Sequence, residues 1–327
     1  MYRHHLHTHW DNSLDPVERV KSGTIVTFDC ADASDGQIQS TSTYEDLQRF
    51  DMARANPLFG PVYVEGAKPG DALEIEFLEI KTAEFGWTGI FKGFGLLHAS
   101  DFSEIDALRI WTIKDGYAST TMGSSRPVQV QIPIRPFCGE IGVARAEDGA
   151  HSAVPPYATG GNIDTKHITV GSRILLPVQV DGALFSLGDG HAMQGDGEVC
   201  GSAIETSVTA RVRITLHAAS SLPYTVRQPQ YTTPSQTEVG EIEREGFHTT
   251  MGIGPDLLEA AKLAVSHMIE YMCGIADGAI GKEDAYVLCS VAGDLHACEV
   301  VDMPNYAMGF RMPEYVLREI RPSRGQG

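Results

Sequence analysis

The sequence predicts an α+β protein in which β-rich sheets, arranged as a sandwich or barrel, pack against a C-terminal helical portion. Two observations carry this prediction. Most of the chain consists of short runs of branched apolar residues that start from glycine turns, as strands do. One stretch near the C-terminus instead places apolar residues at steps of three and four, as helices do.

The β-rich part repeats one plan. Three stretches start from a glycine and continue through branched apolar residues: Gly23–Cys30, Gly70–Ile80 and Gly171–Val180. A fourth, Val208–Leu216, alternates apolar and polar residues, which predicts a strand with one buried and one wet face. The apolar run that reaches Gly188 predicts a further strand, ending at that glycine and followed by a turn.

The helical part is predicted from the pattern over Gly254–Gly274. Pro255 suits a first turn, Asp256 suits the positive end of a helix, and Gly274 suits its stop. A second, shorter helix is predicted over Lys282–Ala292. The apolar face of the longer helix would consist of Leu257, Ala261, Ala264, Met268 and Met272.

A soft domain boundary is predicted near residue 222. The chain between Leu222 and Ile242 is polar and rich in proline, as linkers and surface loops are. The expected division is a β-rich core over residues 1–222 and an α-rich portion over residues 223–327 that packs on it, as two parts or as one domain.

Composition narrows the class of protein. Acidic residues outnumber basic residues by 43 to 25, giving a formal charge of -18, so nucleic acid is not an expected partner. No apolar run reaches the roughly 18 residues that cross a bilayer, so no membrane partner is expected. The six cysteines form no C-x-x-C pair, and the histidine-rich start lacks the apolar core of a secretory signal. These features predict a cytoplasmic protein.

The stretch "GDGHAMQGDGEVCGSAIE", over Gly188–Glu205, crowds four ionisable groups beside glycines: Asp189, His191, Asp196 and Glu198. A carboxylate and an imidazole two residues apart are a common start for a zinc site, and a nearby free carboxylate can serve as a general base. The alternative is that the two aspartates only cap turns, as aspartate often does before glycine.

This stretch resembles the G-D-x-H-A-x-x-G-D-G-E-V-C core of the acetamidase/formamidase family. Other segments resemble further landmarks of that family in the same order, over roughly residues 8 to 315. These segments are Asp32–Ile38, Asn56–Asp71, Gly139–Ala144, Gly160–Lys166 and Val300–Asn305. The resemblance implies hydrolysis of short aliphatic amides to a carboxylic acid and ammonia. It also implies a β-rich α+β fold, a divalent metal ion and a homo-oligomer.

The expected ion is zinc, which activates a water and polarises a carbonyl group. The predicted ligands are Asp189, His191 and Asp32, which directly follows a predicted strand. Glu198 is the predicted base that carries a proton from the water to the amide nitrogen. Asp196 would orient His191 as a partner behind the ligands.

Other residues leave alternatives open. Asn162 and Gln37 lie in glycine-bearing loops and either bind the substrate amide or cap their loops. Cys200 is either a nucleophile or a buried thiol, and the neighbouring acids favour the buried thiol because they raise a thiol's pKa. His9 stands in a family-like context, and His98 is more often a loop histidine than a ligand.

The function classes also stay open at this stage. His98 and Glu140 stand where apolar or small residues are expected in many family members, so a urea-like or carbamate-like amide is the second substrate class. A β-rich module that binds a metal or a small ligand without turnover is the alternative to an enzyme, and its metal would be closed off by four protein ligands. A homodimer, or a multiple of one, would cover exposed sheet edges.

Overall fold

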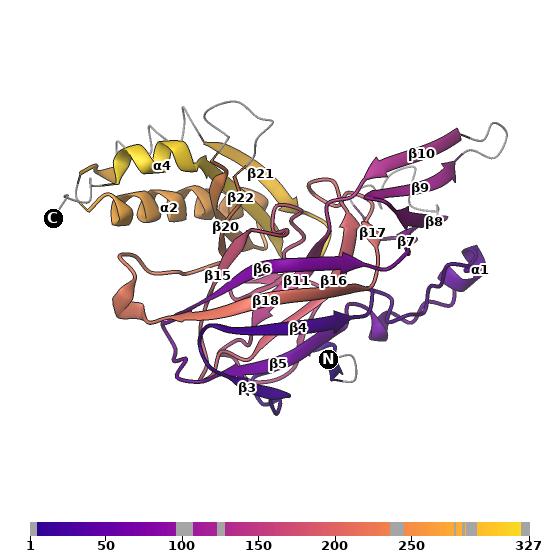
Figure 1. Cartoon of the computed structure of the whole chain (residues 1–327), viewed down its shortest axis with the longest axis horizontal. Helices are drawn as coiled ribbons and strands as arrows, with labels where there is room; N and C mark the ends of the chain where they lie inside the picture. Colours follow the sequence, from indigo (N-terminus) through magenta and orange to yellow (C-terminus); the bar gives the residue numbers. More distant parts are fainter. Residues whose placement is uncertain are drawn as a thin grey trace.

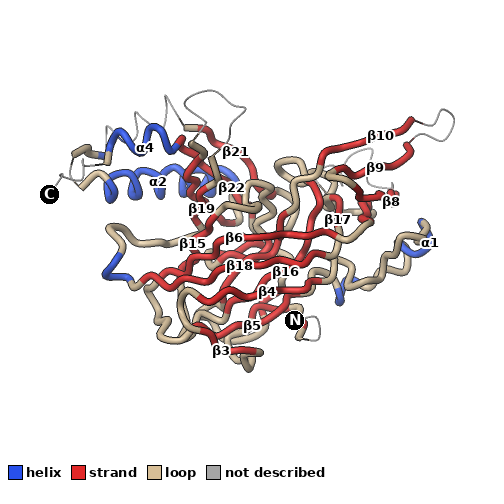
Figure 2. Tube along the Cα trace, in the orientation of Figure 1, coloured by secondary structure: helices blue, strands red, loops and turns tan. Residues whose placement is uncertain are grey.

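The computed structural model describes residues 5–95, 107–122, 128–235, 245–277, 279–282, 285 and 293–321. Within these residues the chain is mostly antiparallel β-structure with a few helices, as Figures 1 and 2 show. The predicted β-rich α+β class is therefore confirmed.

The larger sheet follows the order β10 (Val128–Pro133), β9 (Tyr117–Met122), β8 (Ala107–Lys114), β7 (Phe85–Ile90), β17 (Ile204–Glu205), β16 (Phe185–Met193), β11 (Phe137–Val143), β14 (Gly160–Asn162) and β13 (Pro156–Tyr157). Beside this path, β5 (Leu58–Val64) pairs with β16, and both β1 (Leu6–His7) and β3 (Glu18–Val20) pair with β5. A short pair joins β2 (His9–Trp10) to β12 (His151–Ser152).

The second sheet follows the order β21 (Asp294–Glu299), β22 (Tyr306–Pro313), β20 (Phe247–Gly254), β19 (Gln230–Thr232), β15 (Arg173–Pro177), β6 (Ala72–Thr82), β18 (Val208–His217) and β4 (Thr24–Cys30). The four stretches predicted as strands from their glycine starts or their alternation are thus neighbours in this one sheet. In β18 the alternation holds: Val208, Ala210, Val212 and Ile214 are buried between less buried polar residues.

The main core lies between the two sheets. Phe28 of β4 and Phe185 of β16 come from different sheets, and their rings meet edge to face with centroids 5.6 Å apart. Phe77, Ile141 and Leu176 are fully buried in the same cluster. The sheets therefore pack face to face, which places β16 and β11 at the centre of the molecule.

Helix α2 (Leu257–Ile275) confirms the predicted helix and packs on β20 and β22 together with α4 (Glu314–Ile320). Asp256 is its N-cap and accepts from the Glu259 amide at 2.9 Å, so Pro255 precedes the helix rather than joining its first turn. Leu257 was wrongly placed on the apolar face, because it is largely exposed at the helix start. Further helical segments whose bounds are described are α1 (Tyr44–Leu47) and the 3₁₀ turns Met52–Arg54 and Ala219–Ser221.

Two predictions about segments need comment. The stretch predicted as a linker after Leu222 was wrong in part, because β19 lies within it and Tyr231 is buried in the main core. The sheet thus continues past residue 222 through β19 to β22, and the domain division there stays a prediction. The helix predicted over Lys282–Ala292 falls largely outside the described residues.

Candidate metal centre and cavity

Strand β16 carries the centre of the candidate site. The prediction that this strand ends at Gly188 was wrong: it continues to Met193 because β11 pairs along one edge and β17 along the other. Asp189 and His191 therefore project from the strand itself, on one side, as their two-residue spacing predicted. On the neighbouring strand β17, Glu205 stands directly opposite His191.

Two carboxylates converge on one ring nitrogen of His191. The Nε2 atom of His191 lies 3.1 Å from Asp189 Oδ2 and 3.0 Å from Glu205 Oε2. The second Glu205 oxygen accepts from the Ala203 amide at 2.7 Å, and the Phe137 ring meets His191 edge to face. Ligands about 2.0–2.2 Å from a common ion are separated by roughly 3 Å, so these donor separations fit a bound cation.

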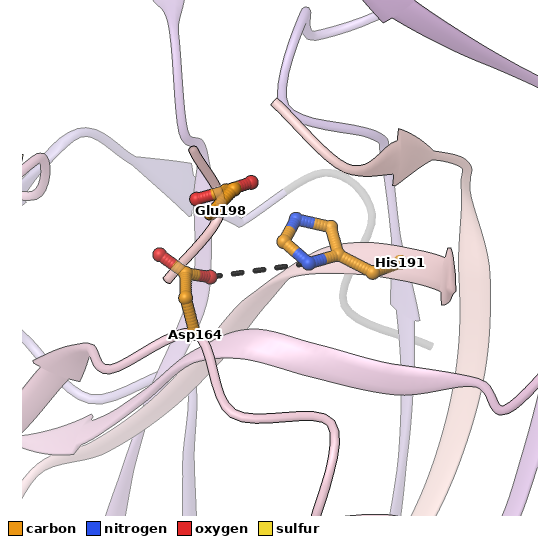
Figure 3. A group of neighbouring side chains, drawn as sticks. All are labelled: Asp164, His191 and Glu198. Atoms are coloured by element: carbon orange, nitrogen blue, oxygen red, sulfur yellow. Dashed lines mark ion pairs between the residues drawn. The ribbon is translucent and has the colours of Figure 1, made fainter. Parts of the chain in front are cut away.

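Two further carboxylates, those of Asp164 and Glu198, lie beyond the end of the His191 ring, and Asp164 faces its other nitrogen (Figure 3). In Figure 3, Asp164 and Glu198 lie on the side of the ring away from its link to the backbone, and the dashed line joins His191 to Asp164. The distance from His191 Nδ1 to Asp164 Oδ1 is 3.9 Å. One potential ligand atom from each of these three buried residues lies within 4.8 Å of the other two.

The backbone is shaped for this convergence. Gly139 of β11 lies beside the cluster, where an added Cβ would overlap the carboxylates of Asp164 and Asp189 and come within 3.1 Å of His191 Cε1. Asp164, Asp189 and Glu198 have φ angles of 40°, 53° and 44°. Positive φ is uncommon outside glycine, so strained backbone holds three of the acids in place.

The cluster holds more negative charge than its surroundings balance. No lysine or arginine is buried among the residues that the structure describes, and His191 is the sole basic side chain within the cluster. Several buried atoms lack a hydrogen-bond partner, among them Asp189 Oδ1, both Asp164 carboxylate oxygens and His191 Nδ1. Besides Asp32, the buried acids among the described residues are Glu140, Asp164, Asp189, Glu198, Glu205, Glu299 and Asp302.

The pKa shifts of the clustered side chains also indicate an excess of negative charge. Burial raises the pKa of Glu205 to about 7. Burial together with neighbouring carboxylates raises the pKa of Asp164 and Glu198 well above the usual range. Burial alone would lower the pKa of His191, but Asp189 and Glu205 raise it well above its usual value. Such a site favours any cation that enters it, because a bound cation offsets the cost of burying ionised carboxylates.

A small cavity opens onto this cluster, with a volume of about 60 Å³. One water needs roughly 10–15 Å³ in this measure, so the cavity admits a molecule of a few heavy atoms. Its polar lining consists of Asn56, Asn162, Asp189, Glu198, Ser202, Glu205 and Asp302. Its aromatic lining consists of Phe50, Trp87, Phe91 and Phe94.

The predicted site residues fall into two groups. Asp189, His191 and Glu198 come together, and Asn162 lines the cavity, where its Nδ2 donates to Asp302 at 2.7 Å. Asp32, Gln37 and Asp196 are held by partners outside this cluster.

Each of these three residues has local partners. Asp32 is buried but accepts from the amide and the hydroxyl of Ser34, at 2.8 and 2.5 Å. Gln37 exchanges two hydrogen bonds with the Asp51 backbone. Asp196 does not reach His191: it lies 3.2 Å from Lys166 and 3.5 Å from His167.

The residues left open by the sequence also have defined places. His9 is exposed on the two-residue strand β2, and His98 lies outside the described residues. Cys200 is half-buried and its Sγ donates to the Ser202 carbonyl at 3.4 Å. Glu140 is fully buried opposite Asn162, and neither of its carboxylate oxygens has a partner.

Sequence reasoning missed Asp164, Glu205 and Asp302. Asp164 and Asp302 lie inside segments that already resembled the family, Gly160–Lys166 and Val300–Asn305, so the signal was present without a role attached. Glu205 ends the motif stretch itself. Only the pairing of β16 with β17 brings it opposite His191.

An antiparallel sheet core with a buried cluster of acids around one histidine, open to a small cavity, defines a candidate metal centre of an enzyme-like kind. The model of the acetamidase/formamidase family matches residues 2–148 and 144–319. The chain therefore belongs to this family.

Individual relatives agree with that assignment. The chain is 26% identical to a formamidase of Methylophilus methylotrophus, over 97% of this chain and 91% of that protein. Its fold matches the crystal structure of an acetamidase from Bacillus halodurans with a TM-score of 0.83 and 28% identity, covering 96% and 97% of the two chains. A predicted acetamidase/formamidase from Thermoanaerobacter tengcongensis matches with a TM-score of 0.81 and 29% identity, over 97% and 96%.

Among the helices in the described part of the chain, none is long and apolar enough to cross a membrane.

Proposed function

We propose that this protein is a metal-dependent hydrolase that cleaves the C–N bond of short aliphatic amides, of the formamide and acetamide type, to a carboxylate and ammonia. The observation that carries the proposal is the convergence of Asp189, Glu205 and His191 Nε2 at about 3 Å, with both carboxylates lining the cavity. Three protein ligands beside an open cavity are typical of catalytic metal sites, whereas structural sites are closed by four.

The proposed ligands are Asp189, His191 and Glu205, and zinc is the proposed ion. Asp32 is not among them in this proposal, because its carboxylate already serves Ser34. When bound, the ion supplies Lewis-acid chemistry: it polarises a carbonyl oxygen and lowers the pKa of water. Asp164 faces the other nitrogen of His191 at 3.9 Å, and its charge would help to orient the ring, the role that the sequence suggested for Asp196.

Glu198 is the proposed general base and acid. Its carboxyl lines the cavity beside the ligands, and its left-handed backbone conformation aims it there. A carboxyl in this position can accept a proton on the attacking side of the amide carbon and return it to the departing nitrogen. That protonation matters because an amide nitrogen is a poor leaving group until it gains a proton.

Asn162 is the proposed substrate-binding residue. Its carboxamide lines the cavity, and its hydrogen bond to Asp302 fixes its orientation. Asp302 is held in turn, because its amide donates to Glu299 Oε1 at 2.5 Å. The aromatic lining, in which the Phe50 and Phe91 rings meet at 5.1 Å, limits the space left for the acyl group and keeps water out. A cavity this small favours amides of one to three carbons.

The test is ammonia release from formamide, acetamide, propionamide and urea, measured before metal removal, after it, and after zinc is restored. We expect turnover of formamide or acetamide that falls on metal removal and returns with zinc. Full activity in the metal-free protein would overturn the metal-dependent mechanism. Turnover of urea alone would assign the second substrate class, and no turnover by the metal-loaded protein would indicate a binding module.

A further inference from the structure

A second polar cavity, with a volume of about 490 Å³, lies over the other face of the eight-stranded sheet. Its lining comes from four neighbouring strands, β6, β15, β19 and β20, and from α2 and α4. Figure 1 shows these two helices at the end of the sheet where β20 and β22 lie. The cavity shares no lining residue with the one at the candidate metal centre.

Two polar side chains that line this cavity are almost completely buried and incompletely paired. Gln230 and His248 are each 3% exposed, and neither Gln230 Oε1 nor His248 Nε2 has a hydrogen-bond partner. His248 is held firmly: its Nδ1 lies 3.0 Å from the Thr232 hydroxyl, and its ring stacks on Tyr271 with centroids 3.8 Å apart. A buried polar atom left without a partner costs free energy, so both atoms favour a ligand that supplies hydrogen bonds.

The charged side chains that line this cavity differ in whether they already form ion pairs. Arg321 pairs with Glu314 at 3.2 Å, and Glu245 pairs with Arg318 outside the lining. Arg173 stands opposite Glu76, whose carboxylate pairs with Arg213 instead, and no ion pair of Arg173 is found within the described residues. The carboxylate of Glu74 lies 3.5 Å from the half-buried His217 and remains on the cavity wall.

The sheet register spaces these two charges. On the paired strands β15 and β6, Arg173 stands opposite Glu76, and Leu175 stands opposite Glu74. Arg173 and Glu74 are therefore diagonal neighbours, about 7–8 Å apart at their backbones, with Leu175 beside them. Two side chains with this backbone separation can bind the two oppositely charged groups of one small molecule. The Leu175 side chain between them would contact its apolar part.

We propose that this cavity binds a free α-amino acid with a neutral polar side chain. Its carboxylate would lie on Arg173 and its ammonium on Glu74, the aliphatic part would cover Leu175, and the polar end would meet Gln230 and His248. The neutral state of His248 supports this assignment, because burial and Arg321 lower its pKa to about 3 and leave a free ring nitrogen for a neutral partner.

The probe is L-glutamine, titrated by calorimetry into the full-length, metal-loaded protein. We expect saturable binding of one molecule per chain. Glutaramate lacks the ammonium, glutaminamide lacks the carboxylate, and L-leucine lacks the polar end, so each should bind at least about tenfold more weakly.

Two charge-removing variants locate the site. Arg173→Gln and Glu74→Gln should each weaken L-glutamine binding by about 10–100-fold, the worth of a charged hydrogen bond. Arg211→Gln, which removes an exposed arginine from β18 outside the cavity, is the matched control and should leave the dissociation constant unchanged.

Several results would overturn the assignment. One is the absence of saturable binding, and another is binding that both cavity variants leave intact. A third is binding that is lost in Asp189→Asn, because that result would place glutamine at the metal centre. The calorimetric readout needs no turnover. A protein that binds L-glutamine in this cavity but hydrolyses no amide would therefore reject the proposed function alone.

Discussion

His191 and His248 are buried to the same degree in the two sheets, yet their surroundings drive them in opposite directions. Around His191, Asp189 and Glu205 raise the pKa well above the usual value despite burial. Around His248, burial and Arg321 lower the pKa to about 3. The comparison shows that burial alone does not mark a metal ligand. What distinguishes the proposed ligand His191 is the excess of carboxylate charge around its ring, which a bound cation would offset.

The largest difference between variants of the two histidines should appear in their metal content. His191→Gln removes a proposed ligand, so we expect loss of the bound ion and a fall in turnover beyond the roughly 10²–10⁴-fold typical of losing a general base. His248→Gln should keep its metal, because within the described residues His248 belongs to no group of side chains close enough to hold an ion. Elemental analysis of both variants, purified without an affinity His-tag, checks this. Equal metal content in the two proteins would contradict the ligand assignment.

The next largest effect separates ligands from the proton carrier within the cluster. Glu198→Gln keeps the shape of the side chain and removes its basicity, so metal content should persist while turnover falls by roughly 10²–10⁴-fold. Both quantities are measured on one sample. A variant that has lost its metal would make Glu198 a ligand instead.

Cys200→Ala is the control for this variant, because its thiol is tied to the Ser202 carbonyl and does not line the small cavity. It should retain most of its turnover. A folded, metal-loaded Cys200→Ala protein without activity would establish Cys200 as the nucleophile and displace Glu198 from its central role.

The comparison also shows which parts of this molecule its sequence could predict. Local patterns predict strands β4, β6, β15 and β18 and helix α2. The signals are a glycine start, an alternation or an N-cap, and each lies within a few consecutive residues. The pair Asp189 and His191 was predictable for the same reason, since two residues of one strand share a side.

The rest depends on pairing between distant strands. Glu205 meets His191 only because β17 lies beside β16, and Asp164 arrives from the loop after β14. Asp196 looked like a partner of His191 from its position in the motif, but the chain turns and delivers it to Lys166 and His167. The two glycines beside Asp189 resembled a turn, whereas neighbours on both edges keep that stretch in the sheet.

The smallest expected effect tests the His248 side of the comparison through the pH dependence of stability. The pKa of His248 is lowered from 6.5 to about 3 on folding, so between these pH values the unfolded chain binds a proton that the folded chain does not. This difference favours unfolding as the pH falls, by at most about 1.4 kcal/mol per pH unit. Above pH 6.5 the contribution to stability is complete, and it disappears progressively on acidification towards pH 3.

The variant His248→Phe keeps a ring against Tyr271 but cannot titrate. Its free energy of unfolding should therefore fall less steeply between pH 6.5 and 4.5 than that of the unmodified protein. Urea unfolding at several pH values in this range measures both slopes, and the carboxylates that titrate nearby cancel in the difference. Parallel slopes would mean that His248 is protonated as readily in the folded protein as in the unfolded chain. The contrast with His191 would then lose its electrostatic basis, because burial would not be excluding charge from this second cavity.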